Sequence, residues 1–339
     1  MDERGFPWSS TAPTVRQRII CAIIIGTAAA AIHYFRPGGY RLSDFSVVWY
    51  ASSFLARGLD PYALVGPHLQ VDLPSPVFYP APALVAAIPL TFLSPDIAGA
   101  TFIFLSAALL AFGATRDSWY LLPIFPSLPF LTSARLGQWS IILTAAAFIP
   151  ALAVLSIAKP QASLPIIMAS KKRATWIAAV IGGIVLLAVS FVLLPSWPAE
   201  WLRLVRSTEY FRPPIASLPG PLIALVLLRW RRPEAWLVFI SASMPQTWYP
   251  YNCLVLLLVA STYREACLLS ILSSAGWLFT LAFQSAVWRG EETRRAMQVT
   301  MLLVGYLPVV VLILRRPNLG PMPVWLRWAL PRRESRLAL

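Results

Sequence analysis

Long apolar runs separated by short basic clusters are the feature that most limits what this chain can fold into. The first run covers residues 19–35, and similar runs recur to about residue 314. Of 339 residues, 58% are hydrophobic and only 12% are charged, whereas soluble domains carry roughly 25% charged residues. Such a chain cannot hide its apolar side chains in a water-soluble core. We therefore expect an all-α polytopic membrane protein.

The apolar runs predict about 12 transmembrane helices, within a range of about 10–13, in a single domain over residues 1–339. Several runs are shorter than the roughly 20 residues that a straight spanning helix needs. The prolines at 123, 126 and 129 favour a broken or re-entrant helix in one of them. The expected segments are 19–35, 77–93, 97–114, 119–133, 138–157, 158–170, 174–194, 215–229, 234–249, 251–262, 266–284 and 297–314.

The basic clusters predict the orientation of these segments. A net charge of +14 could indicate nucleic-acid binding, but the Lys and Arg residues lie between apolar runs, where they set topology. The positive-inside bias predicts a cytoplasmic N-terminus over 1–18 and a cytoplasmic tail over 315–339. It also predicts a first external loop over 36–76 and a second over 195–214. Counting spans places the turn at 135–138 on the cytoplasmic side, but the broken or re-entrant helix before it leaves the local topology there open.

The first external loop carries Asp44, the first acid after the first apolar run. Ser43 is a suitable N-cap, and Gly58 with the following Asp-Pro pair predicts a stop, so we expect a helix over about 44–57. Its polar residues at 43, 46, 50, 53 and 57 form one stripe, which predicts an amphipathic helix lying on the membrane surface. In the first turn, the helix dipole favours an ionised Asp44 carboxylate. Asp44 is then either a general base or only a stabiliser of the helix start.

Four motifs occur in order along the N-terminal half. The first combines Asp44, Trp49-Tyr50-Ala51, Leu55-Ala56-Arg57-Gly58 and Asp60-Pro61-Tyr62; the others are Phe78-Tyr79-Pro80-Ala81-Pro82, Gly137-Gln138 and Lys159-Pro160-Gln161. Together they resemble glycosyltransferase family 87, whose members are multispanning enzymes of the GT-C class that use polyprenyl-phosphate sugars. The resemblance implies a GT-C-like fold, with the acid after the first span as catalytic base. Here that acid is Asp44.

The resemblance implies an inverting hexosyltransferase of the bacterial inner membrane. The sugar, which we expect to be mannose, would pass from a polyprenyl-phosphate donor to a lipid or glycan acceptor on the periplasmic face. A lipid-phosphate leaving group needs no strong acid, so the reaction requires a base for the acceptor hydroxyl and cations for the phosphate. The expected partners are the donor, the acceptor and membrane lipids, with no nucleic acid.

Lys159 is the first candidate for the phosphate, because a lysine between apolar runs is costly without a role or a route to the interface. The alternative is that it extends to the headgroups. Arg206 and Arg212 of the second external loop are weaker candidates, since that loop could equally be an interfacial helix with solvated charges. The matched motifs add candidate contacts to sugar or acceptor, and these are Asp60, Tyr62, Tyr79 and Gln138. Tyr249 and Tyr251 are assigned to the aromatic belt at the membrane interface.

No metal or other cofactor is expected. The sequence has no His-x-x-x-His or Asp-x-Asp pair, and Cys21, Cys253 and Cys267 are scattered. His33, near the end of the first span, is interpreted as an interface residue.

A transporter or lipid flippase is the main alternative, since twelve segments with both ends inside is a common transporter layout. The absence of a visible internal repeat and the long acid-bearing first loop argue against it. Another lipid-linked enzyme, such as a glycan polymerase, is a third possibility.

Overall fold

The computed structural model describes residues 12–37, 43–207, 211–286 and 291–329. The chain is mostly helical, and its only strands among these residues are the short parallel pair β1 (Val65–Gly66) and β2 (Val71–Asp72). Five helical segments are long and apolar enough to cross a membrane, which supports a membrane protein. They are α1 (Val15–Tyr34), α5 (Pro95–Ala114), α9 (Arg173–Leu193), α12 (Tyr263–Ala286) and the segment Glu291–Arg315.

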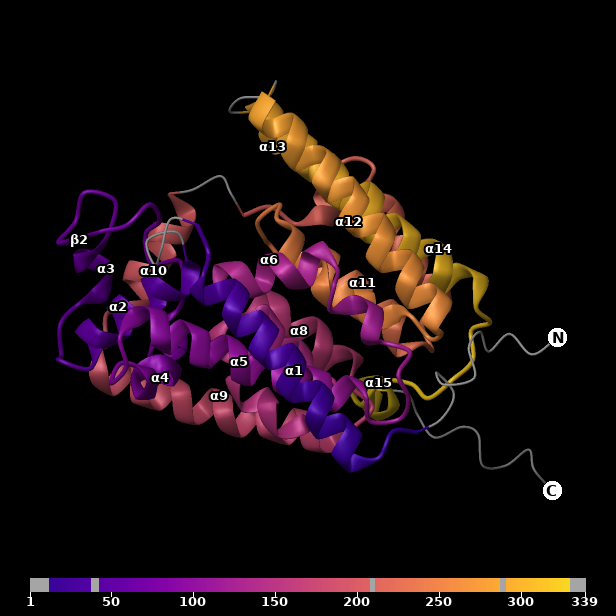
Figure 1. Ribbon diagram of the computed structural model, residues 1–339, viewed down its shortest axis with the longest axis horizontal. Coiled ribbons are helices and arrows are strands. Elements are labelled where there is room, and N and C mark those ends of the chain that lie inside the picture. The colour runs from indigo at the N-terminus through magenta and orange to yellow at the C-terminus, as the bar shows by residue number, and fades with distance from the viewer. Residues whose placement is uncertain (1–11, 38–42, 208–210, 287–290, 330–339) are drawn as a thin grey trace.

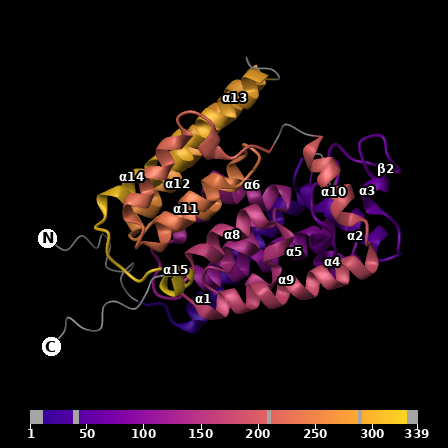
Figure 2. The same ribbon diagram turned by 180° about the vertical axis from the view of Figure 1, so that it is seen from behind.

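The long helices and the loops between them define two ends of the molecule (Figure 1). At one end lie α2 (Asp44–Leu55), α3 (Pro61–Leu64) and α10 (Trp197–Arg206), and we call this the Asp44 end. At the other lie the first residues of α1 and the short helix α15 (Val324–Ala329), and the view from behind agrees (Figure 2). We call it the Arg316 end.

Helices α1 and α5 pack side by side and run in opposite directions. Near the start of α1, Arg18 donates to the Phe112 carbonyl at 2.7 Å, and just beyond its end Arg36 pairs with Asp96 at 3.2 Å. In between, a Cβ added to Gly26 would come within 3.0 Å of the Phe104 carbonyl, so glycine permits this close approach. Helix α5 therefore starts at the Asp44 end.

This direction corrects the expected span at 77–93, which does not cross the molecule. The segment forms α4 (Ala81–Ala87) and the 3₁₀-helix η3 (Ile88–Leu90), and both of its ends stay at the Asp44 end. At its start, Trp201 of α10 donates to the Phe78 carbonyl at 2.9 Å. At its close, Trp49 of α2 donates to the Leu93 carbonyl at 3.1 Å. The prolines break this apolar run into short helices, since Pro80 and Pro82 start α4, Pro89 starts η3, and a proline that starts a new helix does not extend the previous one.

Helix α2 begins where the sequence predicts. The Ser43 hydroxyl accepts from the Phe45 amide at 3.2 Å, which caps the first turn. However, the expectation of a helix lying on the membrane surface is wrong. Most of its side chains are buried against α4, α3 and α5, and Ser46 of the expected polar stripe is only 1% exposed. The 3.6-residue spacing identified the helix, but only Tyr50, Ser53 and Arg57 of the expected polar stripe reach the surface, because protein covers the other sides.

Five short helices replace the three expected spans between α5 and α9. They are η4 (Leu122–Ile124), α6 (Leu128–Leu136), α7 (Ser140–Ala145), η5 (Pro150–Ala158) and α8 (Pro160–Ala169). Four of them carry proline in their first two positions. Because proline fixes φ and lacks an amide hydrogen, it starts a new helix instead of extending the previous one. The broken helix expected near 119–133 is thus confirmed as η4 and α6.

The expected span at 138–157 leaves the Asp44 end and returns to it. From Gln138 the chain runs through α7 to Phe148, whose carbonyl accepts from Lys172 at 3.2 Å. It then comes back along η5, so that Lys159 again lies beside Gln138. Because Gln138 contacts Asp44, the 135–138 turn belongs to the Asp44 end, which corrects the opposite placement given by counting spans.

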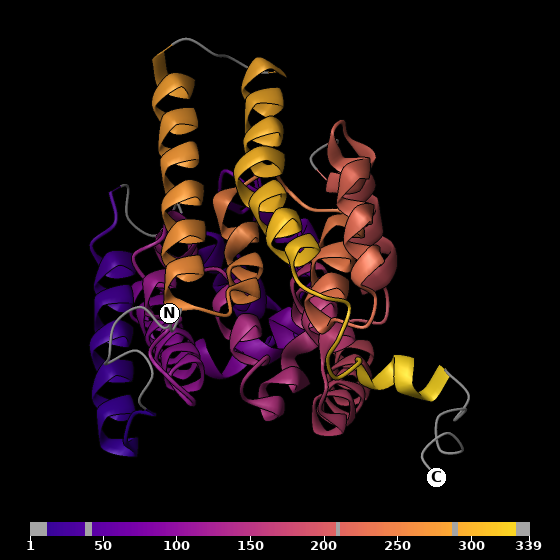
Figure 3. The same ribbon diagram turned by 90° about the vertical axis from the view of Figure 1, so that its right-hand side faces the viewer.

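The second half of the described chain alternates long and short helices. Figure 3 shows α12 and the segment Glu291–Arg315 as a hairpin (orange and yellow) that rises beyond the remaining helices. That segment changes from α13 (Glu291–Thr300) through the π-helix η9 (Met301–Tyr306) to α14 (Leu307–Arg315). The shorter elements are η6 (Pro214–Ala216), η7 (Gly220–Arg229), α11 (Pro233–Ser243) and η8 (Pro250–Val259).

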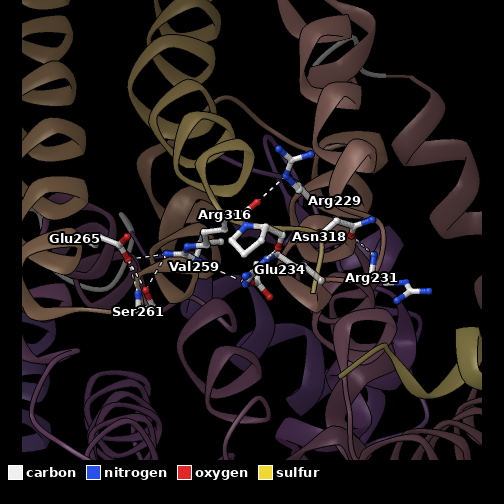
Figure 4. A network of polar contacts seen from close by, with 10 residues as sticks. Arg229, Arg231, Glu234, Val259, Ser261, Glu265, Arg316 and Asn318 are labelled. Atoms are coloured by element: carbon white, nitrogen blue, oxygen red, sulfur yellow. Dashed lines mark hydrogen bonds and ion pairs between the residues drawn. The ribbon is translucent and has the colours of Figure 1, made fainter. Parts of the chain in front are cut away.

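Basic clusters that are far apart in sequence meet at the Arg316 end (Figure 4). Arg316 pairs with Glu265 at 2.6 Å and with Glu234 at 3.4 Å, and its backbone carbonyl accepts from Arg229 at 2.6 Å. Nearby, Arg327 of α15 donates to the Lys171 carbonyl at 2.9 Å. The clusters expected to face the cytoplasm therefore share one end, opposite Asp44.

Candidate functional site

Three segments that are distant in sequence converge on one hydrogen-bonded chain. The side-chain amide of Gln138 donates through Nε2 to Oδ2 of Asp44. Its oxygen Oε1 accepts from Nζ of Lys159 at 2.6 Å. Gln138 and Lys159 are 0% and 6% exposed, whereas Asp44 is only half-buried. The carboxylate is therefore the accessible member of the chain.

The two charges fix the orientation of the Gln138 amide. An ammonium group can only donate hydrogen bonds and an ionised carboxylate can only accept them. The amide oxygen must then face Lys159 and the amide nitrogen must face Asp44. Charge-assisted bonds of this kind are roughly twice as strong as neutral ones.

The tight turn after α6 brings Gln138 to Asp44. Gly137 has φ +71°, and a Cβ there would lie 2.6 Å from Cβ of Phe45. Only glycine adopts this left-handed conformation freely and also leaves room for α2. The Gly-Gln pair of the sequence motif is thus a turn that lets a glutamine approach the helix carrying the acid.

Two side chains hold the last carbonyls of α6 in place. Nδ1 of His33 donates to the Ala134 carbonyl at 3.0 Å, and the Ser43 hydroxyl donates to the Leu136 carbonyl at 3.2 Å. His33 is 1% exposed, so its interpretation as an interface residue is wrong. No sequence pattern indicates this contact, because His33 and Ala134 lie 101 residues apart.

Lys159 is held inside the protein and does not extend to the lipid headgroups. It lies between η5 and α8, where Pro160 starts the next helix. Its ammonium group also lies 4.7 Å from the ring centroid of Tyr251, which is 7% exposed. Tyr251 stacks in turn on Tyr249, with ring centroids 5.6 Å apart. The assignment of Tyr251 to an interfacial belt is therefore wrong.

The remaining motif residues support the site from the α3 side. The Tyr79 hydroxyl lies 3.5 Å from Oε1 of Gln138, and the Tyr62 hydroxyl donates to the Tyr79 carbonyl at 3.0 Å. Asp60 caps α3 by accepting from the Tyr62 amide at 2.9 Å. Tyr79 thus borders the cluster, while Tyr62 and Asp60 hold the segment that carries it.

Arg206 and Arg212 lie on the exposed surface of the same end, unlike the buried Lys159. Helix α10 is tied to the segment before α4 through Trp201, and Phe211 packs edge-on against Phe78 at 5.3 Å. The segment predicted as the second external loop thus contacts the segment that carries Tyr79.

Burial raises the pKa of the Asp44 carboxyl above its ordinary value. The positive charge of Lys159 and the hydrogen bond from Gln138 act in the opposite direction. A carboxylate with a raised pKa is a stronger base than an exposed one once it is ionised. Within the described ranges, no group of three or more His, Cys, Asp or Glu side chains could hold a metal ion.

Comparisons with known proteins found no matching family model, curated protein or solved structure. The resemblance to glycosyltransferase family 87 therefore rests on the four sequence motifs alone.

Proposed function

We propose that this protein is an inverting membrane glycosyltransferase with Asp44 as its general base. The observation that supports this most is the hydrogen-bonded chain from Asp44 through Gln138 to Lys159. It places a half-exposed carboxylate and a buried ammonium group, each from a different motif, in one site. A reaction that removes a proton from a hydroxyl and releases a phosphate needs these two groups.

The proposed reaction starts with an acceptor hydroxyl next to the Asp44 carboxylate. Asp44 takes the hydroxyl proton as the oxygen attacks the anomeric carbon, and the bond from that carbon to the donor phosphate breaks. The bonding electrons leave with the polyprenyl phosphate, whose charge Lys159 stabilises. Attack opposite the leaving group inverts the anomeric configuration. A hexose, with mannose as the expected case, is transferred to a lipid or glycan.

Arg206 and Arg212 are proposed to attract the anionic donor rather than to hold it during reaction. Both are exposed at the Asp44 end, where they would meet the charged part of the substrate first. Tyr79 would border the sugar or the acceptor, and Asp60 and Tyr62 would support the segment that carries it. No divalent metal takes part in the proposed reaction.

The proposed orientation places the Asp44 end at the periplasmic face of a bacterial inner membrane. The Arg316 end and both termini then face the cytoplasm, as the gathering of basic clusters there favours. The segment 77–93 makes no crossing and the segment 138–157 makes two, so the expected number of about 12 crossings is unchanged. A GT-C-like arrangement is part of this proposal.

A transporter or flippase is the second candidate. The observation that favours it is the set of short, proline-started helices around a buried lysine and a carboxylate, since broken helices line the substrate sites of many transporters. The two candidates differ in whether a covalent product forms.

The deciding experiment incubates membranes containing the protein with radiolabelled polyprenyl-phosphate mannose, glucose and arabinose. A labelled lipid or glycan product from one donor, absent with Asp44→Asn, is the expected result. Movement of the intact donor across the bilayer without any product would contradict the transferase and favour the flippase.

A further inference from the structure

The amide of Gln138 is fully enclosed and both of its ends are engaged. Its nitrogen donates to Asp44, its oxygen accepts from Lys159 at 2.6 Å, and the Tyr79 hydroxyl lies 3.5 Å from the same oxygen. With 0% of the residue exposed, no part of the amide faces a space that a sugar could occupy. The expectation that Gln138 binds sugar or acceptor does not fit this geometry.

The amide also separates the two charges. Asp44 and Lys159 form no direct ion pair within 4.0 Å, although both are among the described residues. A direct pair would hold the ammonium group on the carboxylate, so that neither group could act fully on substrate. With Gln138 between them, each charge keeps one bond to the amide and leaves its other bonding positions for substrate.

We propose that Gln138 is a positioning residue that links Asp44 to Lys159 and keeps the carboxylate ionised and oriented. The proposal rests on the proposed function only for the roles of Asp44 as general base and of Lys159 in binding the donor phosphate. The link itself is a property of the protein alone, because it needs no substrate to form.

The link has a measurable consequence in the protonation of Asp44. A hydrogen bond donated to a carboxylate stabilises its charged form, and so does the nearby ammonium group. Among the residues that the structure describes, the other titratable groups that face Asp44 are the hydroxyls of Tyr79 and Tyr251. Since both remain uncharged at neutral pH, Gln138 and Lys159 are the groups that favour ionisation.

The test measures the protonation of Asp44 without any transfer reaction. Dicyclohexylcarbodiimide forms a stable N-acylurea with protonated carboxyl groups in apolar surroundings. Membranes holding the full chain are treated at a series of pH values, and the labelled fraction of the peptide containing Asp44 is quantified by mass spectrometry. The midpoint of that curve reports the apparent pKa.

Gln138→Met keeps the length of the side chain and removes both hydrogen bonds. We expect the labelling midpoint to rise by about one pH unit, a tenfold change in the ionisation equilibrium. Gln138→Glu keeps the shape and adds a negative charge, so its midpoint should rise at least as far. If Gln138→Met does not fold, Gln138→Glu carries the same test. The matched control is Gln246→Met, since Gln246 is another buried glutamine and bonds to Tyr306 instead.

A combined variant tests the link itself. Lys159→Met should also raise the midpoint, and Gln138→Met/Lys159→Met should raise it by less than the sum of the two single shifts, because the amide passes the effect of the lysine to Asp44. An unchanged midpoint in both Gln138 variants would overturn the proposal, and so would strictly additive shifts. Labelling does not depend on sugar transfer, so a protein without transferase activity would contradict the proposed function and leave this result standing.

Discussion

At the scale of single residues, Asp44 is the group on which the proposed chemistry depends. It combines partial exposure, which lets a hydroxyl approach, with one hydrogen bond from a buried amide, which fixes the orientation of the carboxylate. Its place in the first turn of α2 adds the favourable end of a helix dipole. The first two properties suit a general base and the third favours its ionised form, whereas a residue that only stabilises a helix start needs just the third.

Asp44→Asn should nearly abolish transfer while the protein still folds. Asparagine keeps the size of aspartate and can still accept from Gln138, but it cannot take a proton. Loss of a general base typically lowers rates by about 10²–10⁴-fold. The measurement is initial transfer rate in purified, monodisperse protein. Asp72→Asn is the control, because Asp72 bonds to the His68 amide elsewhere in the same loop. More than about a tenth of wild-type activity in Asp44→Asn would reassign the base.

The pH dependence of transfer should show an acidic limb that belongs to Asp44. A base acts only when ionised, so activity is present above its pKa and is lost as pH falls through it. Because burial raises the pKa of Asp44, the loss should occur at a higher pH than the value of about 4 usual for an exposed carboxyl. The measurement is kcat/KM between about pH 4 and 8, and a profile that stays flat down to pH 4 would contradict the prediction.

Lys159→Ala should weaken the use of donor by about 1.5–3 kcal/mol, the usual value of a hydrogen bond to a charged group. Lys159→Arg should recover only part of this, since a planar guanidinium does not replace a compact ammonium group. The measurement is kcat/KM for the donor. Lys172→Ala is the matched control, since that lysine binds a carbonyl near the Arg316 end. Equal kinetics in both alanine variants would remove Lys159 from the site.

The sequence predicted the individual residues of this site better than their contacts. The four motifs that carry the family resemblance include Asp44, Gln138 and Lys159. They did not predict that Gln138 lies between two charges, nor that Tyr251 packs on Lys159. Those contacts depend on the path of α7 and η5, which a single sequence does not reveal.

At the scale of elements, the turn after α6 is the structure that assembles the site. His33 donates there to the Ala134 carbonyl, and we predict that it positions Gln138 through this contact. The N-cap of α2 was predictable from Ser43 because capping involves neighbours in sequence. The burial of α2 and the return of 77–93 were not, since both depend on which helices pack together, and hydropathy alone does not distinguish lipid from protein surroundings.

His33→Leu should lower both stability and transfer, and His33→Asn should restore most of each. Leucine leaves the buried Ala134 carbonyl without its donor, which costs about 1–3 kcal/mol. The asparagine amide can replace the donor. The measurements are the thermal unfolding midpoint and the transfer rate. Ser106→Ala is the control, since it removes another buried hydroxyl-to-carbonyl bond, within α5.

Repeating the His33 substitutions in a Gln138→Ala background shows whether His33 acts by positioning Gln138 or only by stabilising the fold. If His33 acts through Gln138, His33→Leu should change the transfer rate much less in that background. The same fold-loss in both backgrounds would show that His33 only supports the fold.

At the scale of the whole molecule, the two ends have opposite characters. The Asp44 end carries the carboxylate and the aromatic segment around Tyr79, and the Arg316 end joins three helix ends through paired charges. Arg316 is 14% exposed at its side chain, so its pairs are partly shielded from solvent, and loss of either acidic partner would leave this charge less compensated. In the proposed orientation, the paired charges lie at the cytoplasmic end and the half-buried Asp44 lies at the outer end, which suits a site that receives substrates from one face.

The orientation and the path of the chain can be tested together by cysteine labelling. Alternation of the expected spans places Asp117 outside and Arg135 inside, whereas the structure places Asp117 just beyond α5 at the Arg316 end and Arg135 next to the turn that contacts Asp44. Both side chains are exposed. In a background without the three native cysteines, Arg135→Cys should react with membrane-impermeant maleimide in intact spheroplasts. Asp117→Cys should react only after the membrane is opened.

Two further positions calibrate this labelling. Leu69→Cys lies in the first external loop and should react from outside, and Lys171→Cys lies beside α15 and should not. Reversal of all four positions would invert the molecule in the membrane and place Asp44 in the cytoplasm, away from the face where the proposed donor is displayed. If only the Asp117 and Arg135 positions label from the opposite side, the segment 77–93 must cross the membrane. That result would contradict the antiparallel pairing of α1 with α5, which brings Gln138 and Asp44 to the same end of the molecule.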